Sequence, residues 1–431
     1  MAEPAWPEGL TTSAARALEA SGYQRLSDLA GAPLLDIGSI KGVGPRTIAV
    51  LAAALDAAGT PFTGVTEARR HWRGQARPGS QKWAGSGRRG AGASGKGASG
   101  RASGRASGKG GSGRSGAGLG EPVELEVDGR TVRLSSPNRV YFPEQGWTKL
   151  DVARYYLAVG EGILRATRDR PTMLHRFPEG LAGEKVYSKR VPRGAPAWVP
   201  TVRLDFPRYG LHADEVAPAS VADIVWAVQM STVEFHPWNV RSTDVDRPDE
   251  WRIDLDPMPD ATFDDVRLVA AVARALLDEL GMTGYPKTSG GSGLHVYVRI
   301  RPEWEFGDVR RAAWAFASEM AARLPDHATV AWWRKDRDPR HVFIDFNQNA
   351  RDHTLAAAYS LRGVPAGTVS TPITWDELED VDPRDFTLAT VPGRFAELGD
   401  VAAGLDDAAF GLEELLERAA RLEADTHLPD D

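Results

Sequence analysis

Residues 251–257 have the sequence Trp251-Arg252-Ile253-Asp254-Leu255-Asp256-Pro257. Apolar and polar side chains alternate along this stretch, and a period of two residues predicts a β-strand. Because successive side chains of a strand point to opposite faces, Arg252, Asp254 and Asp256 share the face opposite the apolar residues. The two carboxylates can converge on hard divalent cations, and their position at a strand end suits two-metal phosphoryl transfer. A solvated strand face is the alternative, since the Asp-x-Asp pattern is common.

A glycine-rich segment, KTSGGSGLH, occupies residues 287–295. Its backbone amides and the Ser289 hydroxyl can face phosphate oxygens. The segment leads into a second alternating strand, with His295 at its start on the face opposite the apolar residues. We therefore predict that Ser289 and His295 lie near a nucleotide triphosphate. A flexible hairpin loop with a surface histidine is the alternative.

A third segment, HVFIDFNQN, occupies residues 341–349 and again alternates, which predicts a strand. Asp345 and Asn347 share one face of this strand, and its apolar residues share the other. Asp345 can complete a trio of carboxylates with the two aspartates of residues 251–257. Arg362 follows and is a candidate clamp for the triphosphate.

The region from residue 121 to the C-terminus alternates strand-like and helix-like segments, which indicates an α+β fold. The predicted helices are Phe263–Leu280, Val309–Leu324 and Phe410–Leu422. Thr262 can cap the first of them, with Asp265 as the capping-box acid. Gly281 should end it.

The composition of the 431 residues is that of a largely globular protein, with 42% apolar and 26% charged residues. There is no cysteine, which excludes disulfides, thiolate zinc sites and cysteine nucleophiles. The sequence has no apolar run of about 18 residues and no signal-peptide core. We therefore expect a cytoplasmic protein that does not act at a membrane.

The first region, residues 1–66, is expected to form a small all-α domain. Residues 40–49 have the sequence IKGVGPRTIA, which looks like the hairpin of a helix-hairpin-helix module. Its glycines permit a tight turn, and the helix expected over Thr47–Ala58 can hold a DNA phosphate at its N-terminus. An ordinary packing unit or a protein-docking version of the same module is the alternative.

The second region, residues 67–120, is a Gly-, Ser- and Arg-rich segment that we expect to be a disordered linker. It contains twelve lysines and arginines and no acidic residue between Ala68 and Gly120, although the whole chain has a net charge of −7. A basic segment joined to acidic globular parts indicates contact with nucleic acid. A purely solubilising linker is the alternative. The third region, residues 121–431, is the predicted catalytic domain.

The order of the three chemical motifs resembles the archaeo-eukaryotic primase superfamily. Further segments resemble the polymerase domain of the bacterial ligase-D family, here expected as a stand-alone domain. They are His236-Pro237-Trp238, residues 331–333 (AWW), residues 345–352 (DFNQNARD) and residues 370–378 (STPITWDEL). The resemblance covers about Glu121 to Leu398. It implies a primase-polymerase-like core with two antiparallel sheets and flanking helices that line a cleft.

The resemblance also implies the roles of individual residues. Asp254, Asp256 and Asp345 would bind two divalent metals, with Mn²⁺ favoured and Mg²⁺ possible. The residues implied to contact the incoming nucleotide are His236, Ser289, His295 and Arg362. Those implied to contact DNA are Arg139 and Lys149, at a 5′-phosphate, and Tyr187, at the template. Two positions depart from the family pattern: Val186 replaces an aromatic residue beside Tyr187, and His175 stands where relatives often carry lysine.

The function implied by the resemblance is template-dependent DNA or RNA polymerisation from 3′-hydroxyl ends and gaps during non-homologous end joining, with ribonucleotides preferred. The expected partners are DNA ends with a 5′-phosphate, nucleoside triphosphates, Ku and a separate DNA ligase, in a nucleoid-associated setting. The sequence has no Lys-x-Asp-Gly adenylation motif, so we expect no nick sealing. The alternatives are a primase-polymerase that makes primers and a DNA-end bridging scaffold with little catalysis.

Overall fold

A computed structural model gives the fold of the chain. It describes residues 118–206, 211–424, 426, 428 and 429 and, of the first 63 residues, 6, 7, 10, 12–33, 37, 40, 43, 45–60, 62 and 63. The chain divides into two units, Met1–Gly108 and Lys109–Asp431. Each unit is described by itself.

The N-terminal unit is helical in its described part. It contains α1 (Thr12–Ala20), the 3-10 helix η1 (Leu26–Leu29) and α3 (Pro45–Ala57). Its buried apolar residues are Leu18, Leu29, Ile37, Val43, Leu51, Leu55 and Phe62. The helix predicted from Thr47 begins two residues earlier, at Pro45. Lys41, Gly42 and Gly44 of the predicted hairpin and most of the predicted linker lie outside the described residues, so the helix-hairpin-helix module stays a prediction.

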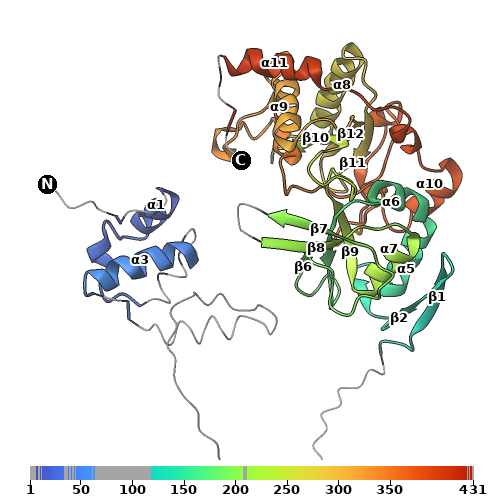
Figure 1. Cartoon of the computed structure of the whole chain (residues 1–431), viewed down its shortest axis with the longest axis horizontal. Helices are drawn as coiled ribbons and strands as arrows, with labels where there is room; N and C mark the ends of the chain where they lie inside the picture. Colours follow the sequence, from blue (N-terminus) through green and yellow to red (C-terminus); the bar gives the residue numbers. More distant parts are fainter. Residues whose placement is uncertain are drawn as a thin grey trace, which may run out of the picture. The chain divides into compact units, whose positions relative to one another are not determined.

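A five-stranded sheet places residues 251–257 in its central strand. Its strand order is β11 (Tyr285–Thr288), β12 (Leu294–Arg299), β10 (Glu250–Pro257), β14 (Val342–Ile344) and β13 (Ala328–Thr329). Neighbouring strands are antiparallel except β13 and β14, which are parallel. Both α8 (Phe263–Glu279) and α9 (Phe306–Arg323) pack on β10, and α11 (Glu413–Glu423) packs on α9 (Figure 1).

A second sheet is antiparallel throughout. Its strands are β6 (Val186–Ser188), β5 (Thr172–Arg176), β8 (Leu211–Val216) and β7 (Thr201–Phe206), with β9 (Thr232–Pro237) paired to β5. The helices beside it are α5 (Lys149–Ala158), α6 (Gly160–Thr167) and α7 (Val221–Gln229). Of these, α7 contacts β9, α5 and α6, so the three helices form one layer next to this sheet (Figure 1).

Short elements complete the second unit. They are the hairpin β1 (Val123–Val127) and β2 (Arg130–Leu134), the pair β3 (Val140–Phe142) and β4 (Trp147–Thr148), and α10 (Val391–Leu398). The 3-10 helices are η3 (Arg334–Asp336), η4 (Phe346–Asn349), η5 (Glu377–Glu379), η6 (Pro383–Asp385) and η7 (Ala403–Asp406). Within the described residues, no helix is both long enough and apolar enough to cross a membrane.

One hydrophobic core continues through both sheets and fixes the central strand. It includes Ile253 and Leu255 of β10 together with Leu174 of β5. Trp251 is also buried there, and its ring meets Phe316 of α9 edge-on, with centroids 4.8 Å apart. Such a pair contributes about 0.5–1.5 kcal/mol beyond its area burial. The apolar face predicted for this strand therefore anchors it, which leaves the opposite face for the carboxylates.

The mixed fold of strands and helices expected from the sequence is confirmed. Helix α8 begins at Phe263 as predicted, and the backbone N–H of its cap Thr262 donates to Asp265 Oδ2 at 2.8 Å. The expectation of two antiparallel sheets holds for the second sheet only, because β13 runs parallel to β14. The last helix begins at Glu413 instead of Phe410, since the backbone of Phe410 bridges to Ile300.

Candidate active site

Three aspartates meet at one end of the five-stranded sheet. Asp254 and Asp256 lie on β10, and Asp345 follows directly after β14. Leu255 pairs with Ile344 in the β10–β14 ladder, and this register brings the residue after β14 beside the β10 carboxylates. One carboxylate oxygen of each aspartate lies within 4.8 Å of the others. The structure therefore brings together the trio that the sequence predicted.

The electrostatics of the trio favour a bound cation. Burial, followed by the charges of Asp256 and Asp345, raises the pKa of Asp254 well above its ordinary value. Burial and Asp345 also raise the pKa of Asp256. Among the described residues, no donor meets the buried Asp254 Oδ1 at hydrogen-bonding geometry. A divalent cation would satisfy this oxygen and offset the like charges, and carboxylate ligands suit hard ions such as Mn²⁺ or Mg²⁺.

The chain turns at Asp345 instead of continuing as a strand. The sequence predicted a strand through residues 341–349, whereas β14 ends at Ile344 and η4 follows. The Asp345 carboxylate accepts the backbone N–H of Asn347 at 3.0 Å and the side-chain amide of Gln348 at 2.8 Å. Local bonds of this kind compete with strand pairing. The predicted strand was therefore too long, but the turn still holds Asp345 beside the trio.

His295 reaches the trio from the neighbouring strand, β12. Asp254 and His295 are register partners, and His295 Nε2 lies 3.3 Å from Asp254 Oδ1. On the other side of the ring, His295 Nδ1 lies 2.8 Å from Lys287 Nζ. Lys287 Nζ also donates to Ala356 O at 2.9 Å and to the Ser370 hydroxyl. When Lys287 donates to Nδ1, the ring proton must sit on Nε2, which faces Asp254.

Burial keeps this histidine neutral. Burial, followed by the nearby charges of Lys287 and Arg362, lowers the pKa of His295 well below its ordinary value. Burial, followed by the charge of Arg362, also lowers the pKa of Lys287. The imidazole can thus donate one hydrogen bond from Nε2 without adding a positive charge beside the candidate metal ligands.

The glycine-rich loop between β11 and β12 folds around the Ser289 hydroxyl. Ser289 Oγ accepts the N–H groups of Gly291 and Gly293, each at 3.1 Å. These two amides are used within the loop and are not available to a phosphate, and phosphate contact by the rest of the loop stays a prediction. The Ser289 O–H can still donate to a ligand. Gly290 has φ +71°, and a Cβ there would lie 2.5 Å from the Arg362 side chain, so glycine is required at this close approach.

An open cleft with a volume of about 330 Å³ collects these groups. Among the residues that line it are His236, Asp254, Asp256, Ser289, His295 and Arg362. Arg362 joins the two sheets across it, because Nη1 donates to Ser289 O at 2.5 Å and Nε lies 3.5 Å from Glu234 Oε2. The cleft therefore contains all four residues predicted to contact the nucleotide, next to the predicted metal ligands.

Glu234 is a residue of the site that the sequence analysis missed. It precedes His236 by two residues on β9, so both side chains lie on one face of the strand. Its Oε2 lies 2.8 Å from His236 Nε2. Burial lowers the pKa of His236 to about 3 in spite of this contact, so the ring is neutral. The local sequence alternates, with Thr232, Glu234 and His236 on one face of the strand, and this pattern does not reveal the partners of Glu234 in other segments.

The structure places Lys149 in the interior. Its side chain is buried, and Nζ donates to Ser135 O (3.1 Å), Gln229 O (2.7 Å) and Gln229 Oε1 (2.9 Å). Burial, followed by the charges of Arg139 and Arg176, lowers the pKa of Lys149 to about 8. Protein oxygens thus use all three donors of the ammonium group, and a 5′-phosphate could bind Lys149 only after these bonds exchange. Phosphate binding by Arg139 and Lys149 stays a prediction.

Tyr187 lies apart from the cleft on β6. It is 63% exposed, and the neighbouring Val186 is 39% exposed. The edge of its ring meets His175, with centroids 4.7 Å apart. An exposed aromatic side chain on an outer strand can stack on a base. Template contact by Tyr187 stays a prediction.

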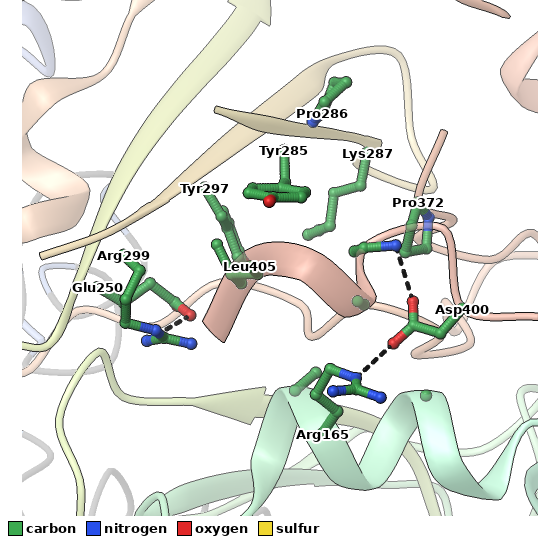
Figure 2. Close-up of a pocket in the computed structure, with 14 residues that line it drawn as sticks. Arg165, Glu250, Tyr285, Pro286, Lys287, Tyr297, Arg299, Pro372, Asp400 and Leu405 are labelled. Atoms are coloured by element: carbon green, nitrogen blue, oxygen red, sulfur yellow. Dashed lines mark hydrogen bonds and ion pairs between the residues drawn. The ribbon is translucent and has the colours of Figure 1, made fainter. Parts of the chain in front are cut away.

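A second cavity lies beside Lys287 (Figure 2). Figure 2 shows Tyr285 and Lys287 directed from β11 toward Leu405, with Arg165 bound to Asp400 on the far side. Its volume is about 30 Å³, enough for about one water molecule. This cavity is a packing gap, and the open carboxylate cleft is the candidate site.

Comparison with known proteins gives the family. The family described as "LigD, primase-polymerase domain" matches residues 148–402. The chain belongs to this family. The LigD assignment confirms the resemblance on which the sequence analysis relied, and it makes the chain a nucleotidyltransferase of the primase-polymerase class.

Individual relatives agree with the LigD assignment. The multifunctional non-homologous end joining protein LigD of Pseudomonas aeruginosa is 31% identical over 268 residues, which are 62% of this chain and 32% of that protein. The bifunctional LigD of Bacillus subtilis is 28% identical over 271 residues, which are 62% of this chain and 43% of that protein. The chain therefore matches less than half of the length of these two relatives.

A solved structure shares the fold. The polymerase domain of Mycobacterium tuberculosis ligase D, determined in complex with DNA, superposes with a TM-score of 0.61 at 28% identity. The match covers 65% of this chain and 99% of that domain. The LigD polymerase fold is thus present here almost in full.

Proposed function

We propose that the protein is a template-dependent polymerase that adds nucleotides to 3′-hydroxyl DNA ends and gaps during non-homologous end joining. The observation that carries this proposal is the trio Asp254, Asp256 and Asp345, which lies next to a cleft holding Ser289, His295 and Arg362. Family membership supports the reaction class, and the names of the relatives support the repair process.

The trio would hold two divalent cations, with Mn²⁺ favoured. Such ions lower the pKa of the attacking 3′-hydroxyl and neutralise the triphosphate. Asp254 Oδ1 fits this use, because His295 Nε2 lies 3.3 Å from this buried oxygen but does not meet it at hydrogen-bonding geometry, which leaves the oxygen open to a metal. Neutral His295 contacts the same carboxylate through Nε2, 3.3 Å from Asp254 Oδ1. His295 would thereby orient a metal ligand without placing a second positive charge next to the cations.

The cleft would bind the triphosphate of the incoming nucleotide. The Ser289 O–H and the Arg362 guanidinium can donate to phosphate oxygens, and charge-assisted bonds to arginine are strong. The 3′-oxygen of the primer then bonds to the α-phosphorus, and the bond to pyrophosphate breaks. His236 would lie beside the nucleotide, and Tyr187 and Arg139 would contact DNA.

The finer features of the function follow from the family resemblance. They are a preference for ribonucleotides, a 5′-phosphate at the far side of a gap, and cooperation with Ku and a separate ligase. The structural neighbour was solved with DNA, which supports DNA as the substrate.

The test is extension of a 5′-phosphorylated gapped duplex with Mn²⁺, supplied with either ribonucleotides or deoxyribonucleotides. We expect templated addition by the wild type and a loss of at least about 100-fold in Asp254→Ala/Asp256→Ala, because both metals lose ligands. Asp264→Asn, which changes an exposed carboxylate on α8, serves as the matched control and should extend normally. Tight DNA binding without addition by the wild type would refute the proposal and favour an end-bridging scaffold.

A further inference from the structure

Glu234 lies at the centre of a buried group of donors in the second sheet. Its Oε2 lies 3.1 Å from His175 Nδ1, its register partner on β5, and 2.8 Å from His236 Nε2. Arg362 Nε lies 3.5 Å from the same oxygen. The two imidazole rings are stacked, with centroids 3.7 Å apart, so both present a nitrogen to one carboxylate oxygen.

The other carboxylate oxygen of Glu234, Oε1, also accepts hydrogen bonds. Glu234 Oε1 accepts Lys185 Nζ at 2.9 Å and the backbone N–H of Gly363 at 3.0 Å. A Cβ on Gly363 would lie 2.9 Å from this oxygen and would also overlap the Phe177 ring, so glycine permits the approach. Four hydrogen-bond donors from four separate parts of the chain, joined by an ion pair with Arg362, therefore converge on one buried carboxylate.

A metal centre is the competing interpretation, because His175, Glu234 and His236 have a ligand set that could hold an ion. The surroundings oppose it. Lys185 and Arg362 bring positive charge to both carboxylate oxygens, and a divalent cation would have to displace these contacts. Both imidazole contacts to Glu234 are already at hydrogen-bond distance. Both oxygens of Glu234 thus have partners without a metal, and within the described residues the unpartnered buried ring nitrogen of the three side chains is His175 Nε2.

The carboxylate fixes the wall of the nucleotide cleft. Because Glu234 accepts at His236 Nε2, the ring proton sits on Nε2 and the unprotonated Nδ1 is the remaining polar atom. Glu234 also balances the charge of Arg362, whose other end donates to Ser289 O. Two of the groups that line the cleft thus depend on one side chain that is itself not among its lining residues.

We propose that Glu234 is a positioning residue for the incoming nucleotide, which sets the tautomer of His236 and the placement of Arg362. Lys185 directly precedes Val186 and Tyr187 on the exposed strand β6, so the same carboxylate links that strand to the cleft. This inference rests on the proposed function, because it assigns the nucleotide as the ligand of the cleft.

The experiment compares Glu234→Gln with Glu215→Gln. Both glutamates are buried in the second sheet, but the neighbours of Glu215 are Trp238, Lys189 and Asp352, none of which lines the cleft. A glutamine is neutral and has one acceptor oxygen, so it cannot accept from all four donors or form the ion pair with Arg362. We expect Glu234→Gln to raise the KM for the nucleotide about 10-fold or more, with kcat within about 3-fold. Glu215→Gln should leave both unchanged.

Nucleotide binding is measured separately by calorimetry with Mn²⁺ and a non-hydrolysable nucleoside triphosphate. Absence of addition by the wild type refutes the proposed function, whereas equal binding by wild type and a folded Glu234→Gln refutes the inference. Titration of Zn²⁺ into Asp254→Ala/Asp256→Ala tests the metal interpretation. Stoichiometric Zn²⁺ binding that Glu234→Gln removes would overturn the positioning role.

A spectroscopic measurement on the wild type keeps the inference testable if Glu234→Gln does not fold. In protein labelled with ¹⁵N-histidine, His236 should show a protonated Nε2 and an unprotonated Nδ1. His236→Gln assigns the resonance. The opposite tautomer at His236 would contradict the proposed hydrogen bond and with it the inference.

Discussion

At the scale of single residues, the candidate catalytic site contains side chains whose burial would be unfavourable without partners. Asp254 is buried beside two like charges, and His295 is held neutral next to it. Glu234 shows the opposite solution. Burial alone would raise the pKa of Glu234, but the hydrogen bonds from His175 and His236 outweigh this effect and lower the pKa below its ordinary value. This carboxylate therefore stays charged without a metal. Asp254 and Glu234 are both buried but differ in their partners, and of the two only Asp254 lies beside like charges that a cation would offset.

The aspartate trio predicts how stability depends on pH and metal. Because the pKa of Asp254 is raised in the fold, the folded state holds a proton that the unfolded chain releases near the ordinary carboxyl range. Stability is therefore full at low pH and falls as the pH rises above that range. Mn²⁺ should offset this loss, so we expect a larger Mn²⁺-induced rise in Tm at about pH 8 than at about pH 5.5, measured by calorimetry against EDTA.

The control for this effect is Asp254→Asn/Asp256→Asn, which should lose the Mn²⁺ response at both pH values. Asp264→Asn should retain it, since that side chain is 83% exposed. An equal Mn²⁺ response in wild type and the double variant would show that the ion binds elsewhere.

At the scale of elements, strand register assembles the site. The pairing of Asp254 with His295, and of Leu255 with Ile344, brings residues from three distant segments together. Gly293 lets the glycine-rich loop pack closely against β10. A Cβ at this position would lie 2.5 Å from Leu255 O and 3.4 Å from Asp256 Oδ1. The loop can therefore approach the proposed metal ligands only through a glycine.

This close approach gives a prediction for Gly293→Ala. The added methyl group should push the loop away from β10 and displace Asp256, so we expect extension activity to fall by at least about 10-fold, since small misplacements of catalytic groups are costly. Gly307→Ala is the matched control. A Cβ at Gly307 would have no other atom within 4 Å, and the residue sits in the first turn of α9, so this change should be neutral or slightly stabilising. Normal activity of Gly293→Ala in steady-state extension assays would show that the close approach at Gly293 does not position Asp256.

Elements also show what the sequence could and could not predict. Alternation located β10 and the start of β12, because apolar side chains lie on one face of each strand and polar ones on the other, although both faces are buried over most of their length. It failed at Asp345, where a side chain that bonds its own backbone ended the strand. It could not predict the parallel pairing of β13, a strand of two residues. Glu234 was missed because its importance lies in partners from other segments, which no local pattern reveals.

At the scale of the whole molecule, the charge distribution separates two tasks. The cleft in the second unit contains a cluster of carboxylates. The predicted linker, in contrast, has twelve basic residues and no acidic residue between Ala68 and Gly120. The second unit, with its hydrophobic interior continuous through both sheets, contains every residue proposed for catalysis. Catalysis and non-specific attachment to DNA should therefore be separable by deletion.

The deletion of residues 1–120 tests this separation. We expect kcat on a gapped duplex to stay within about 3-fold, because β1 begins only at Val123 and the cleft lies beyond it. DNA affinity should fall, most strongly at low salt, and the slope of log affinity against log salt should shrink by about 0.9 for each phosphate that the protein no longer neutralises. Full-length protein with the twelve lysines and arginines of residues 68–120 changed to glutamine separates charge from the first domain. If that variant keeps the wild-type slope while the deletion variant does not, the phosphates are bound by residues 1–66. If both keep it, DNA attachment resides in the catalytic unit, and Arg139 and Tyr187 become the next residues to change.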